Sequence, residues 1–203
     1  MKRSNDKIRY LTELALLVAI ILVMKLTGLA SIPVGPLVMT FTMVPIAIGA
    51  MLMGPLAGGI LGMVFGFTSY YDAVTGASLM TGVFFQLNPV STFVLCVGMR
   101  ILVGVLAGWL FRGLKQIDPT KTVSYFAVGL ATPLLNTLLF MGYIVLFFYQ
   151  SDFVQEKVVA LGAANPFMFV ILMVGVQGLV EAVTGAVVGG GVGKAVAHAL
   201  KRD

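Results

Sequence analysis

Polar side chains that interrupt long apolar runs are the first feature of this sequence: Arg100, Asn136, Gln177 and Glu181. The guanidinium of an arginine presents a planar fork of donors that fits a carboxylate. Side-chain amides offer donors and acceptors to amides and hydroxyls, and a glutamate accepts hydrogen bonds from hydroxyls. A charge inside a membrane-spanning segment normally faces the bundle interior and finds a partner there. These residue types therefore predict a binding site for a small anionic molecule.

The helices that carry these residues are predicted to bring them to one level. At a rise of 1.5 Å per residue, Arg100, Asn136 and Gln177 each lie about 15 to 20 Å from one end of their helix. Asn136 shares a stripe with Thr132 and Tyr143, and Gln177 shares one with Glu181 and Thr184. Polar groups from three late helices are thus expected to line a common pocket, with Tyr143 at its edge.

Two interpretations of Glu181 stay open on the sequence alone. Glu181 either pairs with Arg100 and locks two helices together, since intramembrane charges commonly pair, or it accepts hydrogen bonds from the ligand. A ligand site that uses both, with Glu181 orienting Arg100, is also possible. Aromatic residues flank the polar segment 71–89, and the site prediction includes one of them, Tyr71, as part of a cap over the pocket.

Composition assigns the chain to the integral membrane proteins. Of its 203 residues, 59% are hydrophobic and only 10% are charged, with a mean hydropathy of +1.03, whereas soluble domains carry about 25% charged residues. We expect one membrane domain, residues 1–203. The net charge of +5 comes from short clusters between apolar runs, which does not predict nucleic-acid binding. The lone cysteine and lone histidine predict neither disulfides nor a metal site.

The fold class that follows is an all-α membrane protein with six transmembrane helices. The expected helices cover residues 8–30, 37–53 with a kink at Pro45, 56–70, 91–112, 123–149 and 167–200. The segment 71–89 is expected to be a long outer loop that acts as a lid, and Lys25 is expected to extend toward the interface. The basic residues gather in the termini and in the loop after the fourth helix: Lys2, Arg3, Lys7, Arg9, Arg112, Lys115, Lys121, Lys194, Lys201 and Arg202. This bias predicts that both termini are cytoplasmic.

Glycines at positions 58, 62 and 66 form a ridge on the third expected helix. Such a ridge favours close packing of a neighbouring helix inside the chain. The alternative is an interface between copies of the chain, which would suit an oligomeric channel or membrane scaffold. Catalysis is not expected, because no Ser–His pair or metal-ligand spacing is present and the run GGGVGKA at 189–195 lacks the first glycine and the Ser/Thr of a phosphate loop.

Several stretches resemble the S components, the substrate-binding subunits, of energy-coupling factor (ECF) vitamin transporters. The first helix carries Ala15 and Ala19 in ALLVA, similar to the small-residue motif with which that family docks on its coupling subunit. Three later stretches look like the pantothenate-specific branch: MRILVGVLAGWLF at 99–111, LNTLLFMGYIVLFF at 135–148 and GLVEAVTGAVV at 178–188. That branch often has proline before the arginine, where this chain has Met99.

The resemblance implies a subunit in a prokaryotic plasma membrane that captures pantothenate (vitamin B5) from outside. It implies as partners a membrane-embedded coupling (T) subunit and two cytoplasmic ATPases, with no cofactor of its own. Arg100 and Asn136 match positions expected to bind the vitamin, whereas Gln177 and Glu181 are added from their depth and face. An S component for another vitamin, such as folate or a pyridoxine-like compound, is the nearest alternative.

Overall fold

The structure is a computed structural model of the 203-residue chain. It describes residues 2–28, 31–34, 37–120 and 122–201, and for 2–5, 31–34 and 37–40 it describes the backbone only. Three residues used in the sequence analysis lie outside these ranges: Ala30, at the end of an expected helix, and the basic residues Lys121 and Arg202.

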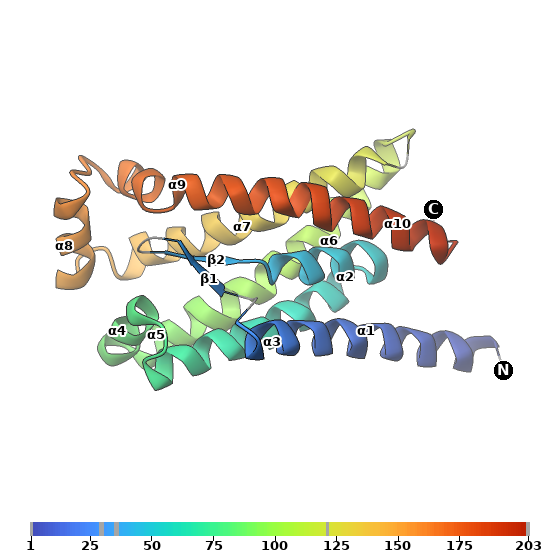
Figure 1. The fold of residues 1–203 in the computed structure, drawn as a ribbon, viewed down its shortest axis with the longest axis horizontal. Helices are drawn as coiled ribbons and strands as arrows, with labels where there is room; N and C mark the ends of the chain where they lie inside the picture. Colours follow the sequence, from blue (N-terminus) through green and yellow to red (C-terminus); the bar gives the residue numbers. More distant parts are fainter. Residues whose placement is uncertain (1, 29–30, 35–36, 121, 202–203) are drawn as a thin grey trace.

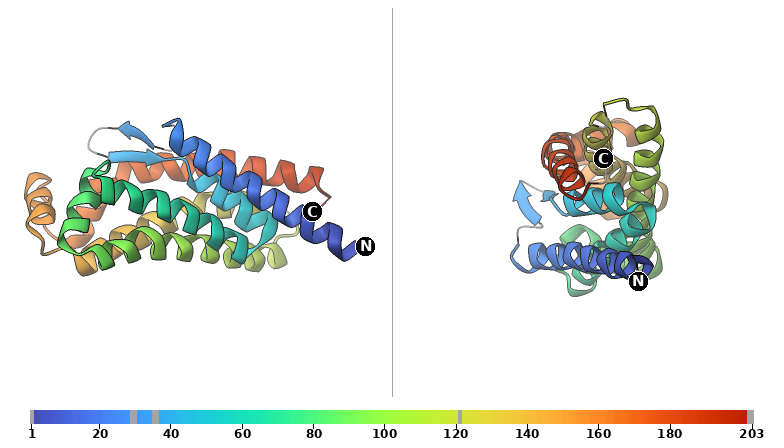
Figure 2. Two further views of the ribbon diagram at one scale, coloured as in Figure 1. Left: turned by 90° about the horizontal axis from the view of Figure 1, so that it is seen from below. Right: turned by 90° about the vertical axis from the view of Figure 1, so that its right-hand side faces the viewer.

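Long helices lie side by side along one axis and form a bundle (Figure 1). Both ends of the described chain lie at the same end of this bundle, here called the terminal end; the opposite, far end carries the short helices α4, α5 and α8 (Figures 1 and 2). The helical elements are α1 Lys2–Leu26, α2 Met43–Met53, α3 Pro55–Thr75, α4 Leu79–Leu87, α5 Pro89–Phe93, α6 Met99–Ile117, α7 Val123–Phe147, α8 Asp152–Ala160, α9 Pro166–Thr184 and α10 Gly191–Ala199, with wide π-helical turns η1 Val94–Gly98 and η2 Gly185–Gly190.

Three continuous helical segments in the described chain are long and apolar enough to cross a membrane: Pro89–Ile117, Val123–Phe147 and Pro166–Ala199. They confirm the fourth, fifth and sixth expected helices as segments of spanning length. The shared end of the two termini agrees with an even number of crossings. The total of six spans and the cytoplasmic side of the termini stay predictions.

The expected second helix is wrong in its first part. Leu37–Thr40 forms strand β2, which pairs antiparallel with β1, Ser31–Val34, so the chain is not purely α-helical. The reason is the pairing itself: the two segments form an antiparallel hairpin, and the β-branched residues in both favour the extended backbone that it requires. The helix α2 begins only at Met43. Pro45 then lies in its first turn, where a missing N–H breaks no hydrogen bond, so the expected kink has no cause.

The expected outer loop at 71–89 is also wrong, because most of it is helical. The helix α3 continues to Thr75 and ends at Gly76, whose φ of 73° is the left-handed conformation that glycine adopts at helix ends. Two short helices follow, and Asn88 begins the second by accepting a hydrogen bond from the Ser91 N–H at 2.9 Å. A folded helical cap therefore closes this part of the far end.

Lys25 does not extend to the interface as expected. Its ammonium forms an ion pair with the carboxylate of Asp72 on α3, and both side chains are half-buried. Pairing lowers the free-energy cost of placing two charged side chains within a membrane protein. The pair fixes the end of α1 against α3, and sequence spacing gave no sign of it because the two residues are 47 positions apart.

The glycine ridge of α3 packs inside the chain, against α6. A methyl group added at Gly58 or Gly62 would overlap the carbonyl oxygen of Gly104 or Arg100, respectively. One added at Gly66 would lie 2.7 Å from the Cα of Val97. The internal-packing prediction is confirmed. The ridge is covered within one chain, which removes the observation that favoured a self-associating channel or scaffold.

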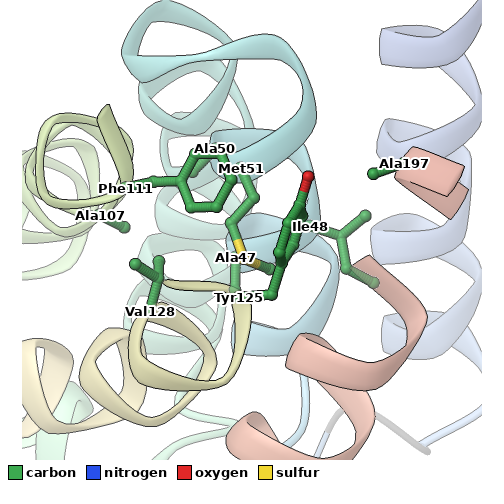
Figure 3. Packing of buried hydrophobic residues seen from close by; sticks show 9 residues of the cluster. All are labelled: Ala47, Ile48, Ala50, Met51, Ala107, Phe111, Tyr125, Val128 and Ala197. Atoms are coloured by element: carbon green, nitrogen blue, oxygen red, sulfur yellow. The ribbon is translucent and has the colours of Figure 1, made fainter. Parts of the chain in front are cut away.

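Buried apolar side chains gather in three clusters along the bundle. The terminal cluster surrounds Tyr125, whose ring packs edge-on against Phe111 with 4.8 Å between centroids (Figure 3). The middle cluster comprises Ile21, Met43, Ile46, Leu61, Phe65 and Val103. The far cluster surrounds Phe84, which stacks on Phe148 at 4.4 Å. Arg100 lies where the middle and far clusters meet, since it contacts Phe65 of the middle cluster and Phe140, which packs against the far cluster.

Candidate functional site

Arg100 is buried in the bundle, with 7% of its surface exposed. Its guanidinium carbon lies 4.5 Å from the ring centroid of Phe65 on α3 and 5.1 Å from that of Phe140 on α7. The Nη1 group donates to the Cys96 carbonyl at 3.0 Å, whereas Nε is buried without a hydrogen-bond partner. In the part of the chain that the structure describes, Arg100 forms no ion pair. The positive charge is thus held by aromatic faces and one carbonyl.

The turn η1 sets the position of this side chain. Directly before Arg100, the Met99 N–H donates to the Val94 carbonyl five residues back, which widens the helix. The backbone of η1 lies directly against Gly66, and the backbone of Arg100 itself lies directly against Gly62. Close packing of α3 therefore fixes where α6 presents its arginine.

Glu181 and Gln177 form one polar unit on α9. Gln177 Nε2 donates to Glu181 Oε1 at 2.9 Å, and Glu181 is 4% exposed. The expected alternative, an Arg100–Glu181 ion pair, is not formed between these two described residues. The carboxylate of Glu181 is bonded by Gln177 of its own helix, so an ion pair with Arg100 does not lock α9 to α6.

Asn136 lies on α7, one turn before Phe140, the ring that contacts Arg100. Its Oδ1 is buried without a hydrogen-bond partner in the described part of the chain. Most buried side-chain polar atoms in proteins are paired, so an unpaired acceptor calls for an explanation. Arg100 and Asn136 therefore present an unused donor and an unused acceptor from adjacent helices.

The clusters on either side place these residues along the bundle. Phe65, in contact with Arg100, belongs to the middle cluster, whereas Phe140 packs against the far cluster. Leu135, next to Asn136, packs against the middle cluster, and Met173, one turn before Gln177, belongs to the far cluster. Arg100, Asn136 and Gln177 thus each lie beside residues of these two apolar clusters, and the common polar layer stays a prediction.

The two predicted tyrosines differ in placement. Tyr143 is half-buried at the far side of the layer, where its hydroxyl lies 3.0 Å from Ser91 Oγ and its ring stacks on Phe147 at 4.3 Å. Tyr71 is 67% exposed, on the outer surface of α3. Its neighbour Tyr70 instead packs against Phe93, at 5.2 Å and edge-on. The structure therefore does not bring Tyr71 to the other predicted residues.

Ala15 and Ala19 are both exposed on α1. The opposite side of the helix packs inward through Leu17, Val18 and the fully buried Ile21. A small-residue face is thus open on the outside of the bundle, where a second helix can approach closely.

A cavity of about 440 Å³ lies elsewhere, at the terminal end. It is open, and it is lined by residues 50–54 at the end of α2 and by Phe111, Arg112, Lys115 and Gln116 of α6. Gly54 caps the carboxyl end of α2, and the guanidinium of Arg112 lies beside this residue. A cation there offsets the partial negative charge at the carboxyl end of the helix. None of the predicted site residues lines this cavity, so we assign the site by the chemistry of its residues. The described residues contain no group of three or more potential metal ligands.

Sequence reasoning missed the two rings that hold Arg100. Helical spacing could have placed Phe140 at the site, since it follows Asn136 by one helical turn. No sequence pattern could have placed Phe65 there, because its contact with Arg100 depends on how α3 crosses α6. A buried threonine, Thr42, was also missed.

Comparison with known proteins agrees with this arrangement. Residues 9–189 match the family described as ECF transporter, substrate-specific component. The chain is also similar to a protein named pantothenate transporter PanT from Leuconostoc mesenteroides subsp. mesenteroides, with 25% identity over 206 residues, covering 98% of this chain and 97% of the relative. The family and this relative are both described as transporters and not as enzymes. The family match covers most of the chain, and the chain therefore belongs to the substrate-specific (S) components of ECF transporters.

Proposed function

We propose that this chain captures pantothenate from the outer side of a prokaryotic plasma membrane and delivers it inward as part of an ATP-driven importer. The observation that carries the proposal is Arg100, a buried cation without an ion pair in the described chain. A carboxylate is the ligand group that its free Nε and its planar fork fit. The similarity to a pantothenate transporter supports this choice of anion.

The remaining groups of pantothenate, an amide and hydroxyls, suit the polar residues around Arg100. Asn136 Oδ1 accepts from a ligand N–H or hydroxyl, which supplies the donor it lacks. Gln177 and Glu181 contribute further polar atoms from α9. Glu181 either accepts from a ligand hydroxyl or holds Arg100 in place through its charge. Tyr143 closes the layer from the far side in this proposal.

Entry from the far end is the route that fits this geometry. The helical cap formed by α4, α5 and α8 lies at that end, away from both termini (Figure 1). Short peripheral helices open at lower cost than the long helices of the bundle, because they bury less apolar surface. In this proposal the termini face the cytoplasm, where two ATPases act through a membrane-embedded coupling subunit.

Titration calorimetry of the purified full-length chain tests the ligand. We expect saturable binding of pantothenate, and no binding of folate, riboflavin, biotin or pyridoxine. Panthenol, in which an alcohol replaces the carboxylate, should bind at least about tenfold more weakly, since a charge-assisted pair with Arg100 is lost. Binding of a different vitamin would assign the chain to another substrate. Equal affinity for pantothenate and panthenol would contradict the role of Arg100.

The docking face on α1 gives an independent prediction. Replacing Ala15 or Ala19 with leucine should reduce co-purification of the coupling subunit strongly, because a bulky side chain keeps the partner helix at a distance. Pantothenate binding by the isolated chain should stay unchanged, since both residues are exposed on the outside of the bundle. Ala15→Ser and Ala19→Ser are the matched controls and should assemble normally. Loss of binding in the leucine variants would show that the docking assignment is wrong.

A further inference from the structure

Thr42 is a buried polar residue that neither the fold nor the proposed site yet explains. It is 0% exposed, and its Oγ1 has no hydrogen-bond partner among the residues that the structure describes. Buried hydroxyls are usually paired, because an unpaired one loses its hydrogen bonds to water without replacement. The residue lies directly before α2, Met43–Met53, in the position of a helix cap.

The ordinary explanation, a helix-capping threonine, fails on geometry. A capping side chain accepts from the N–H of the second or third residue of the helix. Here the third residue is Pro45, which has no N–H, and the Val44 N–H already donates to the Phe41 carbonyl at 3.0 Å. Thr42 also has helical backbone angles, φ −63° and ψ −18°, where caps are usually extended. The hydroxyl therefore has no capping function.

The surroundings of Thr42 connect it to the proposed site. The next residue, Met43, belongs to the middle cluster together with Phe65, whose ring contacts Arg100. Leu135 and Leu139, which pack against the same cluster, lie on α7 beside Asn136. The described start of α2 lies near the middle of the long axis of the bundle (Figure 1), and the N-terminus of a helix carries partial positive charge. Three residues whose buried polar atoms have no hydrogen-bond partner among the described residues are thus linked to one cluster: Arg100 by its contact with Phe65, and Asn136 and Thr42 through their chain neighbours Leu135 and Met43.

We propose that Thr42 is a further ligand contact, whose hydroxyl bonds an oxygen of the captured vitamin while the start of α2 stabilises that oxygen through its partial positive charge. This inference rests on the proposed function and extends the site from the late helices to α2. A short helix that begins inside the bundle is an arrangement that suits polar ligands, because the positive end of its backbone dipole lies inside the protein. The oxygen is a hydroxyl or an amide carbonyl, since Arg100 takes the carboxylate.

Thr42→Val is the decisive variant, because valine keeps the shape and removes only the hydroxyl. We expect the Kd for pantothenate, measured by calorimetry, to rise about tenfold or more. Thr42→Ser keeps the hydroxyl, so its Kd for pantothenate should stay within about threefold of that of the unaltered chain. The loss of one hydrogen bond, by contrast, raises the Kd about tenfold. The midpoint of thermal unfolding without ligand should not fall in Thr42→Val, because the hydroxyl has no partner to lose.

Thr92→Val is the matched control. Thr92 is also 0% exposed, but its hydroxyl donates to the Asn88 carbonyl at 2.9 Å, so its loss should lower stability slightly and leave the Kd unchanged. Unchanged pantothenate binding in Thr42→Val would overturn the inference and leave the proposed function standing. A lower unfolding midpoint in Thr42→Val would also overturn it, because the hydroxyl would then have a structural partner such as a bound water. If the unaltered chain binds no vitamin, the proposed function fails and this inference fails with it.

Discussion

Replacement of Arg100 with methionine is expected to weaken pantothenate binding about 100-fold or more, because the variant loses the charge that pairs with the carboxylate. The ligand-free protein should be as stable as the unaltered chain or more stable. The reason is that Arg100 is buried without an ion pair in the described chain, and replacing a buried charge by an apolar side chain of similar length is often neutral or stabilising. Calorimetry gives the affinity. A thiol-reactive dye gives the unfolding midpoint, since Cys96 is the single cysteine and is buried.

Two controls separate charge from position. Arg112→Met removes a cation from the same helix at the terminal end and should leave pantothenate binding unchanged. Arg100→Lys keeps the charge but not the planar fork, so it should recover only part of the affinity. For panthenol, which lacks the carboxylate, Arg100→Met should cost much less than for pantothenate. If Arg100→Met binds normally and unfolds at a clearly lower temperature, the arginine is structural.

Replacement of Gly62 with alanine should have the second-largest effect, on the fold itself. The added methyl would overlap the carbonyl oxygen of Arg100, so α3 and α6 must separate. Overpacking of this kind costs about 1 to 3 kcal/mol, which corresponds to a fall of about 2 to 12 °C in the unfolding midpoint for a chain of this size. Pantothenate affinity should fall as well, because the displaced backbone carries the arginine.

Gly142→Ala is the matched control for this substitution. Gly142 lies within α7, and an added methyl there has nothing within 4 Å. Alanine should therefore stabilise the helix by about 0.5 to 1 kcal/mol. If Gly62→Ala is as stable as Gly142→Ala, α3 and α6 do not pack as closely as the structure has them.

The arrangement assigns binding and docking to different parts of the chain. Ligand contacts are proposed to come from α2, α6, α7 and α9, whereas the proposed docking face lies on α1. The helix α3 contacts both parts: Asp72 forms an ion pair with Lys25 of α1, and the ring of Phe65 contacts Arg100.

The sequence by itself determined the protein class, the three long late helices and the identity of the polar layer. Composition and hydropathy are properties of the whole chain, so no contact information was needed to recognise a membrane protein. The depths of Arg100, Asn136, Gln177 and Glu181 follow from a constant rise per residue within unbroken helices. The internal use of the glycine ridge also followed from spacing, and the structure confirms it. The resemblance to S components was confirmed by the family match.

Local sequence misled where short segments had competing preferences. The stretch at 37–40 is apolar enough for a helix but forms a strand, because its pairing with 31–34 is a contact between segments. The segment at 71–89 is polar enough for a loop but is mostly helical, because its apolar residues, such as Phe84, pack into the far cluster. Hydropathy averages cannot register such packing.

Only the tertiary structure decided which partners the buried polar groups find. Lys25 forms an ion pair with Asp72, and Arg100 packs between two phenylalanine rings instead of pairing with Glu181. Tyr71 is exposed on the outer surface, whereas Thr42 is buried and does not cap its helix. Each of these outcomes depends on how helices distant in sequence cross and rotate against one another. Helical periodicity fixes the face of a residue on its own helix, but the neighbour that the face meets is set by packing across the whole bundle.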